Sequence, residues 1–249
     1  MPEASVTRLA DSTRAWEVVL QHIEAQLVSG ELKPGDHLPA ERTLAAELGV
    51  GRSSVREAIR VLEVLGLIRT QTGSGPQSGA IIIARPSGGM AALVRLQVAA
   101  HGFAVADVVK TRVVLESAVV EELAATDAAD RDARLSESRD LLDAMESAAL
   151  SRDEFLTLDQ SFHRALAVAS GNEVIASMMT GLRDSIEAYV RVGASFLPDW
   201  SATVDRLRHE HRAVLAAVEA GDADAARTRI RQHIETYHAE TTVTGPNAR

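Results

Sequence analysis

Apolar residues recur at helical spacing through most of the chain, and interruptions of this pattern mark three short helices near the N-terminus. The first predicted helix covers residues 15–28 and ends at a turn rich in glycine and proline. The second covers residues 39–49, with Pro39 in its first turn. The third runs from residue 52 to about residue 65, where Gly66 is expected to stop it. This order, with only a brief turn between the second and third helices, is typical of a helix-turn-helix.

Two runs with high β propensity follow, at residues 67–70 and 80–83, separated by a Gly/Ser/Pro-rich stretch. They predict a two-stranded hairpin with a long tip, which is the wing of a winged helix-turn-helix. The sequence Arg-Pro-Ser-Gly-Gly then has the composition of a flexible joint. We therefore expect a DNA-binding domain over residues 1–84 and a linker over residues 85–90.

The remainder of the chain is almost entirely helix-periodic, and it predicts an all-α bundle of about seven helices over residues 91–241, with residues 242–249 as a tail. The expected breaks lie near residues 102, 126–130, 150, 171, 198 and 221. The fold class is thus mainly α, with a small β-hairpin.

Composition restricts the chemistry that the chain can perform. There is no cysteine, so disulfides and thiolate metal sites are excluded, and any metal must be held by His, Asp or Glu. No uncharged stretch is long enough to span a membrane, and the N-terminus has no signal-peptide pattern. A cytoplasmic protein with no membrane partner is expected.

The net charge of −9 disfavours a nucleic-acid partner at first sight, because attraction to phosphates supplies most non-specific affinity. The acidity is concentrated in the second half, since residues 1–85 carry nine basic and ten acidic side chains. Between Arg42 and Arg69, five arginines stand against three glutamates. The charge distribution is therefore compatible with DNA binding by the first domain.

Three arginines of the third predicted helix, Arg52, Arg56 and Arg60, follow an i, i+4, i+8 spacing and so line one face. A neighbouring face is apolar and consists of Val55, Ile59 and Leu62. A helix packed through the apolar face would present its guanidinium groups to base edges and phosphates of a DNA major groove. The alternative interpretation is a solvated charged face.

The strings from Gly30 to Val50 and from Arg52 to Arg69 resemble the winged-helix domain of the GntR family of bacterial regulators. The resemblance implies that DNA is contacted by Arg42, Arg52, Ser53, Ser54, Arg56 and Gly73. Two features depart from the family pattern. Gly51 stands where Ser or Thr is usual, and the wing carries extra residues.

In the second half, Asp159 and His163 are four residues apart on a predicted helix, so that both side chains project from one face. His211 and His233 lie on two later predicted helices, and antiparallel packing of these helices would bring them to the first pair. A carboxylate and three imidazoles suit Zn²⁺, and also Ni²⁺ or Mn²⁺. Taken singly, each histidine is an ordinary surface or core residue, and we expect the remaining histidines to be surface residues.

These four residues, with the strings around them, resemble the metal-binding positions of the FCD domain, the helical effector domain of the FadR-type branch of the GntR family. The resemblance implies a metal-dependent site for a small carboxylate effector. It places Arg112 at the pocket, although an ion pair with Glu116 explains this arginine equally well. Asn172 is a further candidate for effector binding, or else the cap of the following helix.

The sequence therefore predicts a transcription regulator, expected to be a repressor, whose affinity for a pseudo-palindromic operator is modulated by a small organic acid bound at the metal. A homodimer is expected by analogy with the family. Two alternatives remain at this point. One is a metal-dependent, hydrolase-like enzyme, and the other is a module in which the metal is structural or is itself the signal.

Overall fold

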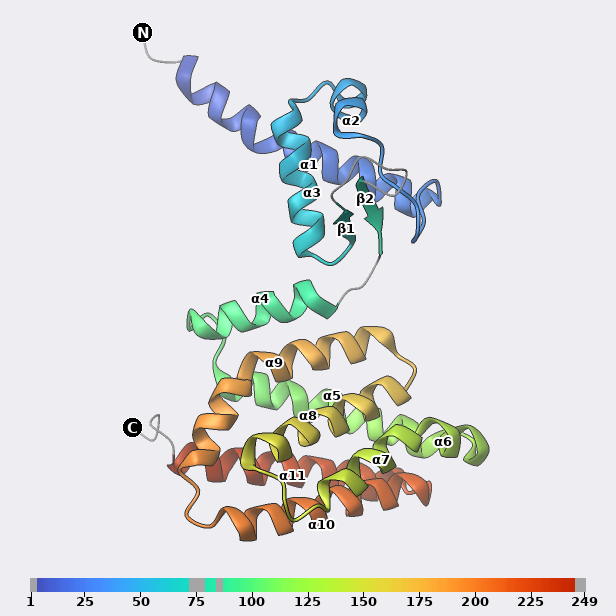
Figure 1. Cartoon of the computed structure of the whole chain (residues 1–249), viewed down its shortest axis with the longest axis vertical. Coiled ribbons are helices and arrows are strands. Elements are labelled where there is room, and N and C mark those ends of the chain that lie inside the picture. The colour runs from blue at the N-terminus through green and yellow to red at the C-terminus, as the bar shows by residue number, and fades with distance from the viewer. Residues whose placement is uncertain (1–3, 72–78, 84–86, 245–249) are drawn as a thin grey trace. The chain divides into compact units, whose positions relative to one another are not determined.

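The computed structural model of the chain describes residues 4–71, 79–83 and 87–244, and it divides into two compact units, Met1–Gly89 and Met90–Arg249 (Figure 1). Each unit has a buried hydrophobic core of its own. Among the described residues, no helix combines the length and apolarity needed to cross a membrane.

The first unit begins with α1 (Ala4–Ser29), α2 (Glu41–Leu48) and α3 (Arg52–Val64). The helix α3 packs against both α1 and α2. Its apolar face is buried, as the sequence predicts for Val55, Ile59 and Leu62. Gly49 ends α2 with a φ of 64°, a left-handed conformation that glycine adopts at little cost and that allows the tight turn into α3.

The wing consists of β1 (Ile68–Gln71) and β2 (Gly79–Ile82), paired antiparallel with Ile68 opposite Ile82. Both isoleucines are buried against the first core, which fixes the register because a shift by one residue would turn them to solvent. The observed strands agree with the predicted ones to within one residue. The tip of the hairpin lies outside the described residues.

Eight helices follow in the described part of the chain, and α5 packs against α8, α9, α10 and α11 (Figure 1). Their bounds are α4 (Ser87–Ala99), α5 (Val105–Ala125), α6 (Ala128–Arg134), α7 (Ser136–Met145), α8 (Arg152–Ala169), α9 (Glu173–Ser195), α10 (Trp200–Glu219) and α11 (Ala223–Thr244). The second core is formed mainly by valine, leucine and alanine side chains. Its scarcity of aromatic residues agrees with the composition of the chain.

Two local details differ from what the sequence pattern indicated. The segment between the breaks at residues 126–130 and 150 was expected to form one helix, but it divides at Leu135 into α6 and α7, so that eight helices replace about seven. Leu135 is fully buried and α7 packs on α8, whereas α6 buries none of its side chains. The helix α4 begins at Ser87, inside the expected flexible joint, although glycine is unfavourable in a helix.

Candidate metal centre and DNA-reading helix

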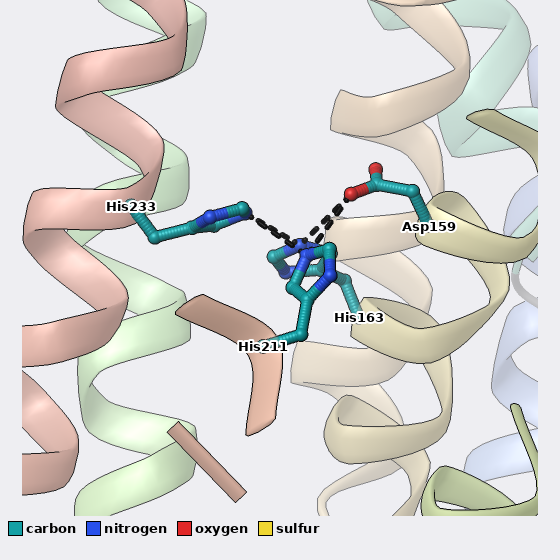
Figure 2. Close-up of side chains that lie close together, drawn as sticks. All are labelled: Asp159, His163, His211 and His233. Atoms are coloured by element: carbon teal, nitrogen blue, oxygen red, sulfur yellow. Dashed lines mark hydrogen bonds and ion pairs between the residues drawn. The ribbon is translucent and has the colours of Figure 1, made fainter. Parts of the chain in front are cut away.

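Four side chains from three helices converge in the second unit: Asp159 and His163 from α8, His211 from α10 and His233 from α11 (Figure 2). One ligand atom of each lies within 4.8 Å of the corresponding atom of every other. The three imidazoles are buried, and the Asp159 side chain is nearly so. The structure thus brings together the whole set that the sequence singled out.

The spacing of these atoms fits a shared cation. The Nε2 atom of His233 lies 3.2 Å from Nε2 of both His163 and His211. The Asp159 Oδ1 atom lies 3.1 Å from His211 Nε2 and 3.7 Å from His163 Nε2. Around a transition metal with bonds of about 2.1 Å, two ligands at angles of about 90–120° are separated by roughly 3.0–3.6 Å. Three of these four separations fall within this range, and the fourth, at 3.7 Å, lies just beyond it.

The outer partners of the imidazoles fix which nitrogen faces the centre. His163 donates through Nδ1 to a carboxylate oxygen of Glu116, and His233 donates through Nδ1 to Glu210 over 2.8 Å. Each of these rings then turns the lone pair of Nε2 inward. Two lone pairs that face each other at 3.2 Å repel, and a cation between them removes the repulsion. The Nδ1 atom of His211 is buried without a hydrogen-bond partner in the described chain.

The protonation of the cluster also suits a metal. Burial, reinforced by the charge of His211, lowers the pKa of His233 to about 3, and burial lowers the pKa of His211 as well. Burial opposes ionisation of Asp159, but Arg183 and the two nearest imidazoles outweigh it and hold the pKa of this carboxyl well below its ordinary value. At neutral pH, two neutral imidazoles and a carboxylate are therefore ready to bind without first losing a proton.

A cavity of about 460 Å³ opens beside these ligands, and Asp159 and His233 are part of its lining. Two buried arginines also line this cavity, and together with Asp159 and His233 they form its charged end, which we call the floor. Arg112 lies on α5 and pairs with Glu116 over 2.9 Å, and Arg183 lies on α9 and pairs with Asp159 Oδ2 over 3.1 Å. Arg112 therefore has both of the roles considered from the sequence, since it forms the ion pair and also lines the cavity.

Several contributors to this site were not singled out from the sequence. Arg183 and Tyr237 line the cavity, and only Tyr237 stands at a helical spacing from a ligand, four residues after His233. Glu210 directly precedes a ligand in the chain, and Glu116 was considered only as a partner of Arg112. His238 was expected to be a surface residue, but it is half-buried and lines the cavity.

Asn172 does not line this cavity. It is the N-cap of α9, and its side-chain oxygen accepts a hydrogen bond from the backbone N–H of Ile175 over 3.1 Å. The structure therefore favours the capping alternative over contact with an effector.

The arginines of α3 lie on its exposed face, opposite the buried apolar residues. Arg56 donates through Nε and Nη2 to one oxygen of Glu41, at 3.2 and 3.1 Å, while both side chains stay accessible. Arg42, near the start of α2, is also exposed. Among the described residues, this arrangement leaves a basic face available to a phosphate backbone.

The N-terminus of α3 has the features of a phosphate contact. Gly51 is the N-cap and offers no side-chain hydrogen bond, so the first backbone N–H groups remain open to an anion. Ser53 is exposed and Ser54 half-buried in the first turn. Gly73, the wing residue implied by the family resemblance, lies outside the described residues.

A winged helix-turn-helix joined to a helical domain with a buried His₃Asp cluster defines a class of protein, the effector-sensing DNA-binding regulators. Residues 16–76 match the profile of the bacterial regulatory proteins of the gntR family, and residues 107–236 match that of the FCD domain. The chain belongs to the GntR family of transcription regulators, in its FadR-type branch with a C-terminal FCD domain. This membership confirms the prediction of a regulator rather than an enzyme.

Two proteins with similar sequences are transcription regulators. The HTH-type transcriptional regulator LutR of Bacillus subtilis (strain 168) is 30% identical over 207 residues, which are 83% of this chain and 91% of LutR. The HTH-type transcriptional repressor NanR of Citrobacter rodentium is 30% identical over 236 residues, covering 90% of this chain and 85% of NanR. Among solved structures, Streptococcus agalactiae GntR superposes with a TM-score of 0.65 at 24% identity, covering 90% of this chain and 99% of that one, and it supports the fold.

Proposed function

We propose that this regulator is a repressor whose FCD domain binds one divalent ion through Asp159, His163, His211 and His233. Zn²⁺ is the simplest occupant of three imidazoles and a carboxylate, and Ni²⁺ or Mn²⁺ accept the same donors. The observation that carries the proposal is the 3.2 Å approach of two Nε2 atoms, those of His163 and His233, whose Nδ1 atoms both face carboxylates, so that a cation between them would be bound by both rings. An ion with more than four coordination positions keeps one or two for an effector or water.

We further propose that the effector is a small carboxylate held between the ion and the two arginines. In the protein alone, Arg112 and Arg183 are balanced by Glu116 and Asp159. A divalent ion adds two positive charges to this balanced set, so the floor of the cavity then favours an anion. A planar guanidinium can engage both oxygens of a carboxylate, which makes arginine well suited to this role.

The DNA-binding unit is proposed to act in the cytoplasm as part of a homodimer on a pseudo-palindromic operator, with α3 in the major groove. Arg42, Arg52, Arg56, Ser53 and Ser54, together with Gly73 in the wing, are the proposed contacts. Arg56→Ala should weaken operator binding by about 1–3 kcal/mol if the side chain reaches a base edge. Unchanged operator affinity, measured by fluorescence anisotropy, would contradict this assignment.

The effector proposal is tested by calorimetric titration of acetate and L-lactate into the zinc-loaded and the chelated full-length protein. We expect binding that weakens at least tenfold after chelation, because the ion supplies part of the carboxylate site. Substitution Arg183→Lys keeps the charge but removes the planar fork, so carboxylate binding should weaken, and zinc affinity is measured in parallel because Arg183 also pairs with Asp159. Zinc binding without any carboxylate binding would instead favour a regulator that senses the metal itself.

A further inference from the structure

Beyond its charged floor, the cavity has apolar walls from three helices. They are formed by Val105 and Val109 on α5, by Ile186, Val190 and Val192 on α9, and by Ile234 on α11. No glutamate or lysine occurs among the described lining residues. A ligand that enters with its carboxylate on the floor therefore places the rest of its body against hydrocarbon.

The walls offer few hydrogen bonds to a polar body. Apart from the floor and Tyr237, the polar side chains of the lining are those of Tyr189, His238 and Thr241, and the Thr241 hydroxyl already donates its proton to the backbone oxygen of Tyr237 over 2.9 Å. A buried hydroxyl without a partner lowers affinity by about 5- to 150-fold. A ligand with several hydroxyl groups would thus lose more hydrogen bonds to water on entering the cavity than it would gain from these walls.

One hydroxyl of the lining, that of Tyr237, is buried and has no hydrogen-bond partner among the described residues. Four charged groups act on it, namely Asp159, Glu240, Arg183 and Arg206, and two of these, Asp159 and Arg183, line the same cavity. Burial, followed by the charge of Asp159, raises the pKa of Tyr237, so that the phenol keeps its proton at neutral pH. Tyr237 therefore brings an unused hydrogen-bond donor to the lining of the cavity.

We infer that the effector is a carboxylate with an apolar body of several carbons, whose head accepts a hydrogen bond from Tyr237 and whose body packs against Val109, Ile186 and Ile234. This inference rests on the proposed function, because it takes the carboxylate end to lie at the ion. It excludes short hydroxy acids and polyhydroxylated sugar acids as the preferred ligands.

The size of the cavity limits the length of that body. Ligand pockets commonly span about 300–1,000 Å³, and a volume of about 460 Å³ lies in the lower part of this range. Each methylene that is transferred from water to an apolar wall improves affinity up to about fourfold. Affinity should rise with chain length and stop rising once the cavity is full.

The test is calorimetry on the zinc-loaded full-length protein with acetate, butyrate, hexanoate and octanoate. We expect the Kd to fall by about tenfold for every two methylenes up to hexanoate, and the heat capacity change to become more negative along the series. Gluconate is the matched polar control, because it has six carbons like hexanoate but carries a hydroxyl on every carbon other than the carboxylate. Its affinity should be at least about 100-fold below that of hexanoate.

Two variants distinguish the contribution of the apolar walls to affinity from that of the hydrogen bond between Tyr237 and the ligand carboxylate. Val109→Thr places a hydroxyl in the wall and should lower the ratio of hexanoate to acetate affinity about tenfold. Val114→Thr, at an exposed position of the same helix, should leave that ratio unchanged. Tyr237→Phe should weaken acetate and hexanoate by the same factor. Should Val109→Thr unfold, Val192→Thr at the exposed rim of the cavity tests the same wall.

The outcomes distinguish this inference from the proposed function. The inference is wrong if the Kd stays the same along the series or if gluconate binds as tightly as hexanoate. In either case, acetate binding that depends on zinc would still support the proposed carboxylate site. If acetate, L-lactate and the longer acids all fail to bind the zinc-loaded protein, both proposals are wrong. A steady gain with length that Val109→Thr reduces, and that Val114→Thr does not, supports the inference.

Discussion

Glu116 occupies the point where the metal cluster meets the arginines, and its replacement by glutamine tests the reasoning about both. The side chain is buried and accepts hydrogen bonds from His163 Nδ1 and from Arg112. Burial opposes its ionisation, but His163 and Arg112 outweigh this effect and lower the pKa of Glu116, so the native group is a carboxylate. Glu116→Gln keeps the shape and removes the charge.

The expected effects are separable. Loss of an outer partner of a ligating histidine commonly weakens metal binding by about 10- to 100-fold, or roughly 1.4–2.7 kcal/mol. The variant also leaves the buried Arg112 without its counter-ion, and breaking such a pair costs about 3–5 kcal/mol. Since the amide oxygen still accepts one hydrogen bond, we expect about 3 kcal/mol and a fall in melting temperature of roughly 6–12 °C in the metal-free protein.

Zinc affinity is measured by competition with a chromophoric chelator, and stability by urea and thermal unfolding. Glu122→Gln, at an exposed position of the same helix, is the matched control and should change neither quantity. Zinc affinity of Glu116→Gln within twofold of the native value, at unchanged stability, would refute the assignment of Glu116 as the residue that positions His163.

Three further predictions concern stability. Removal of zinc by EDTA should lower the melting temperature, because an ion present at about 1,000 times its Kd adds about 4 kcal/mol to the free energy of unfolding. His211→Ala should abolish the difference in melting temperature between the zinc-loaded and the chelated protein. In the metal-free protein, the pKa of His233 is about 3 in the folded state and 6.5 in the unfolded state, so the unfolded state takes up the proton first as pH falls. The free energy of unfolding should therefore decrease by about 1.4 kcal/mol per pH unit for this residue below pH 6.5. Urea midpoints that stay constant between about pH 6.5 and 4.5 would contradict a buried neutral ring. Leu135→Ala, at the fully buried break between α6 and α7, should cost about 2–5 kcal/mol in urea unfolding, whereas Leu96→Ala at an exposed site should have almost no effect.

The sequence was most informative where a local pattern determines the outcome. The 3.6-residue period was enough to assign Val55 and Ile59 to the first core, and the i, i+4 spacing placed Asp159 and His163 on one face. The break at Leu135 was missed because no glycine or proline marks it. It arises from the packing of α7 on α8, which is a tertiary effect.

The residues that complete the site were harder to find than the ligands. Arg183 lies on a helix that supplies no ligand, and its meeting with Asp159 depends on the packing of α8 against α9. Tyr237 follows His233 by four residues on α11, a spacing that could have suggested a shared face. Neither residue type is a metal ligand of choice, so a search for donor atoms alone passes over both.

The convergence of His163 and His233 also has a consequence for the lifetime of the protein. These residues are 70 positions apart, and the chain has no cysteine with which to cross-link itself. An ion bound to both would close that long loop as a covalent bridge does, and such closure is worth about 4 kcal/mol in the chain-entropy treatment. A cell short of the metal would then hold less of the regulator, because the unclosed domain is open to proteases more often.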